Sequence, residues 1–472
     1  MTKRKERKFR AGNQKPAARA EREPLPIYNA ALSGWMGFTA KGKYMDYNET
    51  LEYIARANWR GSKPGLERIT ELCGLLGNPQ KNLKFIHIAG TNGKGSAAAF
   101  LSSILKSAGY KTALFTSPYI EVFNERMQIN GRNIPDDELA EITTYIRPFA
   151  DSMDDLPTEF ELNTAIAFEY FKRNGCDIVV LETGMGGELD STNVIDAPEL
   201  AVFMHISLDH TEYLGDTIEK ITATKAGIIK PGSSVVLYKQ EKNVADIITK
   251  RCEEAGDPLY ISEPDELELA CRDAQRQVFK SRSFGLLAVP LLGSYQKENL
   301  AVVLKAVQVL KTLGYNISTY NISDGLESTK WPARFEIIKK IPPFIVDGGH
   351  NADGMRAVRD SVYDVFKDEK VILIFGVMAD KDYDKMLDII LPCVKEVLCV
   401  APDNARALGA DELAQAVKKK GTEAYACGCI EEAVELAVRK AGRSTPVLAA
   451  GSLYMAGDIR KYVRSQNRQS FE

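Results

Sequence analysis

Short apolar runs alternate with segments of helical apolar spacing along the chain from Met45 onward. In the first part of the chain, the apolar runs predict strands at residues 84–89, 110–115, 177–181 and 201–206. Apolar residues three and four positions apart predict helices at residues 66–76, 96–108 and 296–313, and another that begins at the capping box of Thr158 and ends before Gly175. This alternation is typical of a mostly parallel sheet with helices on its faces.

A polar stretch at residues 323–330 precedes a second alternating region that begins near Trp331. Its apolar runs predict strands at residues 344–346, 371–375, 397–400 and 447–450. Helical spacing predicts helices at residues 355–366, 383–391, 411–420 and 431–441. The second region is therefore predicted to be a smaller, doubly wound, Rossmann-like α/β domain.

The composition is that of an ordinary globular chain, with 44% hydrophobic and 26% charged residues. It excludes collagen-like, low-complexity and wholly disordered proteins. No apolar run approaches the roughly 18 residues that span a bilayer, and no apolar segment follows the charged amino terminus as in a signal peptide. We therefore expect a cytoplasmic protein that does not contact a membrane. The eight cysteines are scattered, and Cys427 and Cys429 alone are a weak metal signal, so we expect reduced thiols.

Charge is distributed unevenly along the chain. Residues 1–26 hold nine Lys or Arg against three Glu, a net charge of +6 that leaves −9 for the rest of the chain. The acidic body is not expected to bind nucleic acid. For the basic segment a solvated, flexible extension is the favoured interpretation, and contact with RNA or an acidic partner is the alternative.

The most informative stretch is a strand, a glycine-rich turn and a helix start. The turn consists of Gly90, Thr91, Asn92, Gly93, Lys94, Gly95 and Ser96. Glycines let several backbone N–H groups converge on phosphate oxygens, the lysine adds a positive charge and the serine hydroxyl can ligate Mg²⁺. The spacing departs from the usual phosphate-loop pattern because an extra glycine separates the lysine from the serine. A chance glycine-rich turn is the alternative, which the flanking strand and helix disfavour.

Three polar residues follow predicted strands or sit near them. Glu182 comes at the end of the strand at residues 177–181, where a carboxylate at the carboxyl edge of a parallel sheet can hold Mg²⁺. His210, one of four histidines, follows the strand at residues 201–206 and is a second candidate ligand. Each could instead be an ordinary loop residue. Lys225, read alone, is most simply a solvent-facing helical lysine.

Eight motifs stand in the order of one known family. They are AGTNGKGS at 89–96, FTSP at 115–118, FNER at 123–126, TEFE at 158–161, LDSTN at 189–193, KAGI at 225–228, PARFE at 332–336 and DGGHN at 347–351. From about residue 45 to residue 463, the chain resembles the folylpolyglutamate synthase and dihydrofolate synthase family of the Mur ligase superfamily.

The resemblance implies an α/β fold in which a P-loop-type ATPase domain, residues 45–328, precedes a Rossmann-like ligase domain, residues 329–464. A basic extension, residues 1–44, and a tail, residues 465–472, would flank them. The implied reaction is ATP-dependent addition of L-glutamate to a folate or dihydropteroate through an acyl phosphate, in a monomeric enzyme. Such a reaction needs ATP and Mg²⁺, in this family two ions.

The resemblance also implies roles for particular residues. Lys94 would neutralise the β- and γ-phosphates, Ser96 and Glu182 would hold one Mg²⁺, and a second Mg²⁺ would lie near His210. Lys225 corresponds to a lysine that is carbamylated in similar enzymes, which turns a cation into a carboxylate-like group.

A second set of implied residues completes the ATP site from both sides of a domain gap. Gln296 and Asn299 resemble the family's adenine-side segment, and a side-chain amide can pair with a base edge. Arg334 resembles an arginine that reaches phosphate from the second domain. Asp347 and His350 match a motif that contacts nucleotide and the incoming glutamate, with His350 in a catalytic role. A hinge near residue 328 would let the second domain close.

The chain departs from the family pattern at four positions. Tyr119 replaces a histidine that is usual after Thr-Ser-Pro, Glu188 stands where arginine is frequent, Tyr295 replaces a common histidine, and Ala352 replaces a frequent proline. Tyr119 and Glu188 lie in loops that could border the pterin, so they bear on which pterin is accepted.

Two other functions remain as alternatives. One is a cell-wall ligase that joins an amino acid to a UDP-linked muramoyl precursor, but the roughly 45 residues before the core are too few for the extra domain such enzymes carry, and their phosphate loop tends to have threonine where Gly95 stands. The other is a nucleotide-dependent switch protein that ligates nothing. The sequence also leaves open the choice between folate and dihydropteroate, the product's glutamate chain length and the extension's role.

Overall fold

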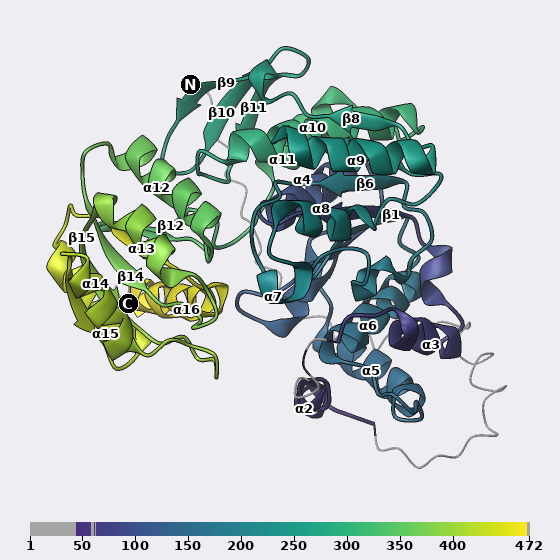
Figure 1. The fold of residues 1–472 in the computed structure, drawn as a ribbon, viewed down its shortest axis with the longest axis horizontal. Helices are drawn as coiled ribbons and strands as arrows, with labels where there is room; N and C mark the ends of the chain where they lie inside the picture. Colours follow the sequence, from purple (N-terminus) through teal and green to yellow (C-terminus); the bar gives the residue numbers. More distant parts are fainter. Residues whose placement is uncertain (1–43, 58–60, 62, 470–472) are drawn as a thin grey trace, which may run out of the picture. The chain divides into compact units, whose positions relative to one another are not determined.

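The computed structural model describes residues 44–57, 61 and 63–469. The predicted basic extension, apart from Tyr44, lies outside these residues. The described part forms two α/β domains, drawn purple to teal-green and green to yellow in Figure 1. Within it, no helix has the length and apolar character needed to cross a membrane.

The first domain is built on an eight-stranded sheet with the order β4-β3-β2-β5-β1-β6-β7-β8. The six strands from β2 to β8 in this order are parallel, and β3 and β4 extend the sheet in antiparallel pairs. The strands are β1 Phe85–Ala89, β2 Thr112–Phe115, β3 Met127–Ile129, β4 Arg132–Asn133, β5 Ile178–Glu182, β6 Leu200–Phe203, β7 Ser234–Leu237 and β8 Leu259–Ile261. The central strands β1 and β5 are buried along their whole length, as parallel strands covered on both faces should be.

Helices cover both faces of this sheet. They are α2 Tyr47–Arg56, α3 Glu67–Leu75, α4 Lys94–Ser107, α5 Asp136–Ala150, α6 Glu159–Arg173, α7 Thr211–Leu214, α8 Ile218–Ala226, α9 Lys242–Ala255, α10 Gln296–Thr312 and α11 Thr319–Glu327. On β1, Ile86 and Ile88 share a core with α4, α10 and α11. Phe85, on the opposite face, packs with α5 and α6, and Ala89 on that face packs with α8 and α9. Side-chain alternation along one strand thus serves two helical layers.

A small antiparallel sheet, β11-β10-β9, lies between α9 and α10 in sequence. Its strands are β9 Leu267–Arg272, β10 Gln277–Ser281 and β11 Gly285–Val289.

The second domain contains a six-stranded sheet with the order β12-β13-β17-β14-β15-β16, parallel except for the β12–β13 pair. The strands are β12 Glu336–Lys340, β13 Pro343–Val346, β14 Val371–Phe375, β15 Val394–Cys399, β16 Glu423–Ala426 and β17 Val447–Ala450. The helices are α12 Ala352–Phe366, α13 Tyr383–Ile390, α14 Ala410–Lys419, α15 Ile430–Ala441 and α16 Leu453–Gln469. Leu373 and Phe375 of β14 pack with α12, α13 and α14, while Ile372 and Ile374 pack with α15 and α16.

The predicted fold class is confirmed, and the predicted elements agree with the observed ones to within a few residues. Two predictions were wrong. The second sheet contains β12 and β16, whose exposed or half-buried residues gave no apolar run. Residues 465–469 are not a tail, because α16 continues to Gln469.

Candidate functional site

The glycine-rich turn leads from β1 directly into α4. Gly93 precedes the helix with a φ of 88°, a left-handed conformation, and a Cβ there would lie 2.5 Å from Asn299 Oδ1. The helix begins at Lys94 and not at Ser96 as predicted, so Lys94, Gly95 and Ser96 form its first turn. The N–H groups of a first turn lack helical partners and can bind an anion. The N–H groups of Thr91 and Asn92, by contrast, donate to His205 O at 2.8 and 3.2 Å.

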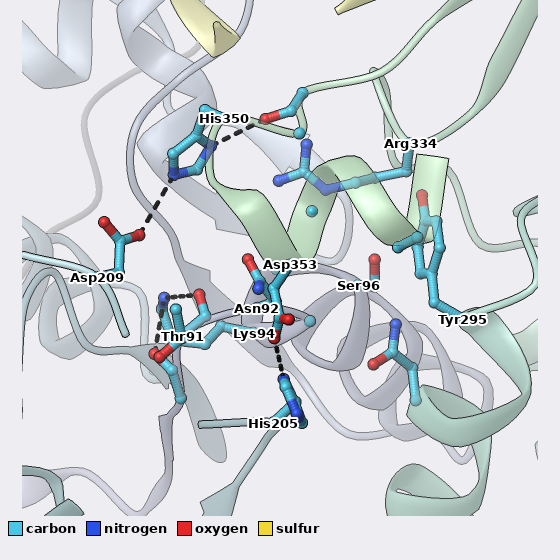
Figure 2. Close-up of a pocket in the computed structure, with 18 of the residues that line it drawn as sticks. Thr91, Asn92, Lys94, Ser96, His205, Asp209, Tyr295, Arg334, His350 and Asp353 are labelled. Atoms are coloured by element: carbon cyan, nitrogen blue, oxygen red, sulfur yellow. Dashed lines mark hydrogen bonds and ion pairs between the residues drawn. The ribbon is translucent and has the colours of Figure 1, made fainter. Parts of the chain in front are cut away.

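Lys94 folds back over the turn that precedes it. Its Nζ donates to Gly90 O at 3.1 Å and to Thr91 O at 3.2 Å, and it lies 4.0 Å from Glu182 Oε1. The loop carbonyls thus hold the ammonium beside the first turn of α4 (Figure 2). A phosphate bound there would meet a positive charge already in place.

Glu182 is the last residue of β5, whereas the predicted strand ended one residue earlier, at residue 181. Its side chain is buried at the carboxyl edge of the sheet, and Oε2 accepts the Ser117 N–H at 3.4 Å. Burial raises the pKa of Glu182, whereas the positive charges of Lys94 and Arg334 lower it. Since Lys94 belongs to the first domain and Arg334 to the segment before β12, cations from both domains act on one carboxylate.

Gln296 and Asn299 stand side by side at the start of α10. Gln296 is fully buried, and its Nε2 donates to Ser96 Oγ at 3.4 Å while its Oε1 accepts from Asn299 at 3.0 Å. The Gln296 amide therefore supports Ser96. Gly95 faces Trp331, whose ring would lie 2.8 Å from a Cβ at that position, so a threonine in place of Gly95 would clash.

Lys225 lies near the end of α8. The interpretation of Lys225, read alone, as a solvent-facing helical lysine was wrong. Lys225 is buried, and its Nζ donates to Gly90 O at 2.9 Å. Burial, with a contribution from the nearby Lys94, lowers the pKa of Lys225 to about 7. A lysine in this state carries a substantial fraction of neutral, nucleophilic amine near neutral pH.

Asp209 is the centre of a cluster that the sequence analysis did not assign. Lys381 Nζ lies 2.7 Å from its Oδ1, and His210 Nε2 lies 4.0 Å from its Oδ2. His350 Nε2 lies 3.8 Å from the same Oδ2 (Figure 2). Burial disfavours the carboxylate, but Lys381 and the two histidines outweigh it and lower the pKa of Asp209. Burial also lowers the pKa of His350, and that of His210 to about 4, so both rings are neutral at pH 7. Asp209 could have been identified from the sequence because it follows β6 closely. Nothing in the sequence near Lys381 indicates that it contributes to the site.

Asp347 directly follows β13 and is buried, and both of its carboxylate oxygens accept hydrogen bonds. Oδ1 accepts the Gly349 N–H at 2.7 Å, and Oδ2 accepts the Phe335 N–H at 2.7 Å and the Tyr295 hydroxyl at 3.0 Å. Arg334 directly precedes Phe335, and its Nη1 donates to Ala333 O at 2.9 Å.

One cavity of about 630 Å³ collects these side chains. Every predicted site residue lines it except Gln296, which supports it from behind. It is also lined by polar residues that the sequence analysis had not assigned, among them His205, Asp209, Tyr238 and Asp353. Tyr119 and Glu188 do not line it; the Tyr119 ring instead lies 5.2 Å from the Arg126 guanidinium.

The donor set around the loop suits Mg²⁺ better than a transition metal. Within residues 44–57, 61 and 63–469, no cluster of three or more His, Cys, Asp or Glu side chains could hold a metal ion by itself. Mg²⁺ does not need one, because it usually takes one or two protein oxygens and fills its other positions with water and phosphate. The Ser96 hydroxyl and the Glu182 carboxylate meet that requirement.

Two family models match the chain: the Mur ligase middle domain over residues 88–307, and the Mur ligase, glutamate ligase domain over residues 333–453. The chain is 34% identical over 432 residues to a dihydrofolate synthase/folylpolyglutamate synthase of Bacillus subtilis (strain 168), covering 89% of this chain and 99% of that protein. It belongs to the folylpolyglutamate synthase and dihydrofolate synthase family. A folylpolyglutamate synthase of Lacticaseibacillus casei is 33% identical, covering 88% of this chain and 98% of that protein.

Solved structures of the same family share the fold. Mycobacterium tuberculosis folylpolyglutamate synthase complexed with ADP and AMPPCP superposes with a TM-score of 0.81 at 27% identity, covering 88% of this chain and 98% of that one. E. coli FolC in complex with DHPP and ADP gives a TM-score of 0.78 at 27% identity, covering 89% and 98%. The family predicted from the ordered motifs is therefore confirmed, and these relatives favour neither the cell-wall ligase nor the switch protein.

Proposed function

We propose that this family member uses ATP to add L-glutamate to a folate through an acyl phosphate. The observation that carries the proposal is the shared cavity: residues 90–96 of the first domain and Arg334 and His350 of the second line the same space. A ligase that uses both ATP and an amino acid needs such a composite site, because the phosphate-binding loop alone could serve any ATPase.

The chemistry follows from the need for a leaving group. An amine cannot displace oxide from a carboxylate, so an oxygen of the folate's carboxylate first attacks the γ-phosphorus of ATP, and ADP departs. The glutamate amine, as the free base, then attacks the acyl carbon, and phosphate departs while the amine loses its proton. Lys94 and the N–H groups of the first turn of α4 would bind the β- and γ-phosphates and keep them in line for the first step.

Arg334 would approach the same phosphates from the second domain. The Arg334 charge lowers the pKa of the Glu182 carboxylate, which supports a role for this guanidinium in stabilising the negative charge that develops during phosphoryl transfer. Because Asp347 already accepts three hydrogen bonds, its role would be to hold this region in shape, in place of the direct nucleotide contact that the resemblance implied.

Ser96 and Glu182 would hold one Mg²⁺ and His210 a second. When bound, Mg²⁺ supplies charge neutralisation on the phosphate oxygens. The lowered pKa of His210 keeps its ring neutral, which a metal ligand requires. His350, also neutral and 3.8 Å from Asp209, would lie beside the incoming glutamate.

Lys225 would be carbamylated in the active enzyme. A near-neutral pKa leaves the amine free to attack CO₂, forming an N–C bond with loss of the amine proton. The product would carry a negative charge near Lys94, which relieves the mutual repulsion of the two lysines.

Tetrahydrofolate and dihydropteroate are the two candidate pterin substrates. The B. subtilis relative carries both activities in its name, whereas the L. casei relative carries one. We propose folate extension as the principal reaction, with dihydropteroate as a second substrate. The predicted monomeric state and cytoplasmic location remain predictions.

The test is a ligation assay with the purified full chain. It would be incubated with Mg-ATP and L-glutamate, in parallel with tetrahydrofolate or dihydropteroate, and products would be weighed by mass spectrometry while ADP is measured. We expect a product heavier by one glutamyl residue and ADP release that requires both co-substrates. ADP release without either co-substrate would support the switch protein instead, and no glutamylated product from either pterin would refute the proposal.

A further inference from the structure

A short segment before α10 connects the cores of the two domains. Leu291 packs in the first-domain core with α4 and α10, whereas the adjacent Leu292 packs in the second-domain core with Phe335 and Ile345. Ser294, two residues later, is bonded to α12 of the second domain, because its N–H donates to Ser361 Oγ at 3.1 Å. Residues 292–295 therefore lie within the first domain's stretch of sequence, but their side chains or backbone contact the second domain.

Tyr295 completes this connection at the cavity. Its hydroxyl donates to Asp347 Oδ2 at 3.0 Å, and the same oxygen accepts the Phe335 N–H at 2.7 Å. Burial first, and then the Asp347 charge, raises the pKa of Tyr295 well above its ordinary value, so the phenol stays a donor. One oxygen thus joins the start of α10 to the backbone that precedes β12.

The backbone around Arg334 needs this support. Ala333 and Phe335, on either side of it, have φ values of 54° and 45°, in the left-handed region that residues other than glycine rarely adopt. Both are fully buried. Hydrogen bonds hold the turn: Gly348 N–H donates to Ala333 O at 2.9 Å, and Phe335 N–H donates to Asp347. A strained turn persists only where its surroundings determine it.

We propose that Tyr295 is a positioning residue for Arg334. By donating to Asp347 Oδ2 from the first domain, it fixes the carboxylate that holds the left-handed turn, and the turn directs the guanidinium into the nucleotide cavity. Figure 2 shows Tyr295 and Arg334 at the same side of that cavity. This inference rests on the proposed contact between Arg334 and the phosphates of ATP.

The test is a double-mutant cycle read by binding of AMPPCP, measured calorimetrically with Mg²⁺ on the full chain. Y295F removes one hydroxyl and keeps the ring, and R334Q removes the charge. We expect Y295F to weaken AMPPCP binding about five- to tenfold, which is within what one hydrogen bond typically contributes. In the R334Q background, adding Y295F should weaken binding by less than about twofold, because a positioning residue has nothing left to position. Matching far-UV circular dichroism spectra for Y295F and wild type would show that the fold is unchanged.

Three results would overturn the inference. Independent, multiplicative effects of Y295F and R334Q would mean that Tyr295 contacts the nucleotide itself, and unchanged binding by Y295F would mean that the hydrogen bond positions nothing. Unchanged binding by R334Q would mean that Arg334 does not contact the phosphates, and the inference would fail with that contact. The ligation assay distinguishes this result from failure of the proposed function, because it measures glutamate addition separately. As a second arm, D347N should also weaken binding, and Y295F should add little to it.

Discussion

The ammonium of Lys225 donates a 2.9 Å hydrogen bond to the carbonyl of Gly90, the first residue of the phosphate loop. A buried cation on α8 is thus anchored to the same loop that Lys94 folds over, since Lys94 donates to the same carbonyl. Two lysines that share one acceptor in a buried site repel each other, and this repulsion is relieved when one of them loses its charge.

The first prediction concerns modification of Lys225. Incubation with ¹³C-labelled bicarbonate should produce a carbamate signal by NMR in the wild-type protein and none in K225A. At fixed dissolved CO₂, the signal should grow as pH rises through about 7, because the amine becomes neutral there. K220A, on the exposed side of the same helix, should keep the signal. A signal that survives in K225A would place the carbamate elsewhere.

The second prediction concerns the phosphate loop. K94A should lower ligation at least about a hundredfold, the usual cost of removing a group that stabilises transition-state charge, while leaving the fold intact. K106A, an exposed lysine in the last turn of the same helix, is the matched control and should behave as wild type. Turnover by K94A close to that of K106A would refute the role given to Lys94.

The third prediction concerns Glu182. E182A should abolish ligation and weaken the dependence of AMPPCP affinity on Mg²⁺, because a buried carboxylate at the sheet edge would be lost from the metal's ligand set. Calorimetric titrations of AMPPCP with and without Mg²⁺ measure this. If the difference between the two titrations is as large in E182A as in wild type, Glu182 does not hold the metal.

The fourth prediction concerns a pair of arginines on α16. Arg460 is buried, with its Nε 2.7 Å from Glu336 Oε2 and a further ion pair to Glu121 of the first domain, while Arg464 shares these carboxylates and is 49% exposed. R460M should lower the free energy of unfolding by about 2 kcal/mol, since two half-buried carboxylates lose their main partner. R464M should cost under about 1 kcal/mol. Urea unfolding compares the two, and equal costs would contradict the difference in burial.

The fifth prediction concerns the buried His87. Its Nε2 lies 2.8 Å from Thr192 Oγ1, which itself donates to Asp190 at 2.5 Å, so the His87 ring must be the donor to Thr192. Burial first, and then Lys230, lowers the pKa of His87 to about 3. Below pH 6.5 the unfolded chain binds a proton that the folded chain does not, so this residue reduces stability as pH falls, by about 2 kcal/mol between pH 6.5 and 5.

H87Q removes that titration. Its free energy of unfolding in urea should therefore fall less than that of wild type when the pH is lowered from 7 to 5, whatever its stability at pH 7. Identical losses in the two proteins would show that His87 is protonated in the folded state.

Much of the fold could be predicted because its signals are local. The apolar run of β14, the capping box of Thr158 before α6 and the glycines before α4 act within a few residues, through side-chain periodicity and backbone conformation. The strands β12 and β16 escaped prediction because edge strands need no continuous apolar run.

The same contrast holds for the site. The sequence alone determined the phosphate loop, the order of the family's motifs and hence the family. Each motif is a contiguous stretch whose chemistry can be inferred from its own residues. The tertiary structure alone decided that Lys381 reaches Asp209, that Tyr295 bonds to Asp347 and that Gln296 supports Ser96. These pairs are separated by 52 to 200 positions, and no local rule relates their members. Gln296 meets Ser96 because α10 and α4 pack in one core, and the other two pairs meet because the two domains pack together. Such long-range packing is set by the sum of many contacts.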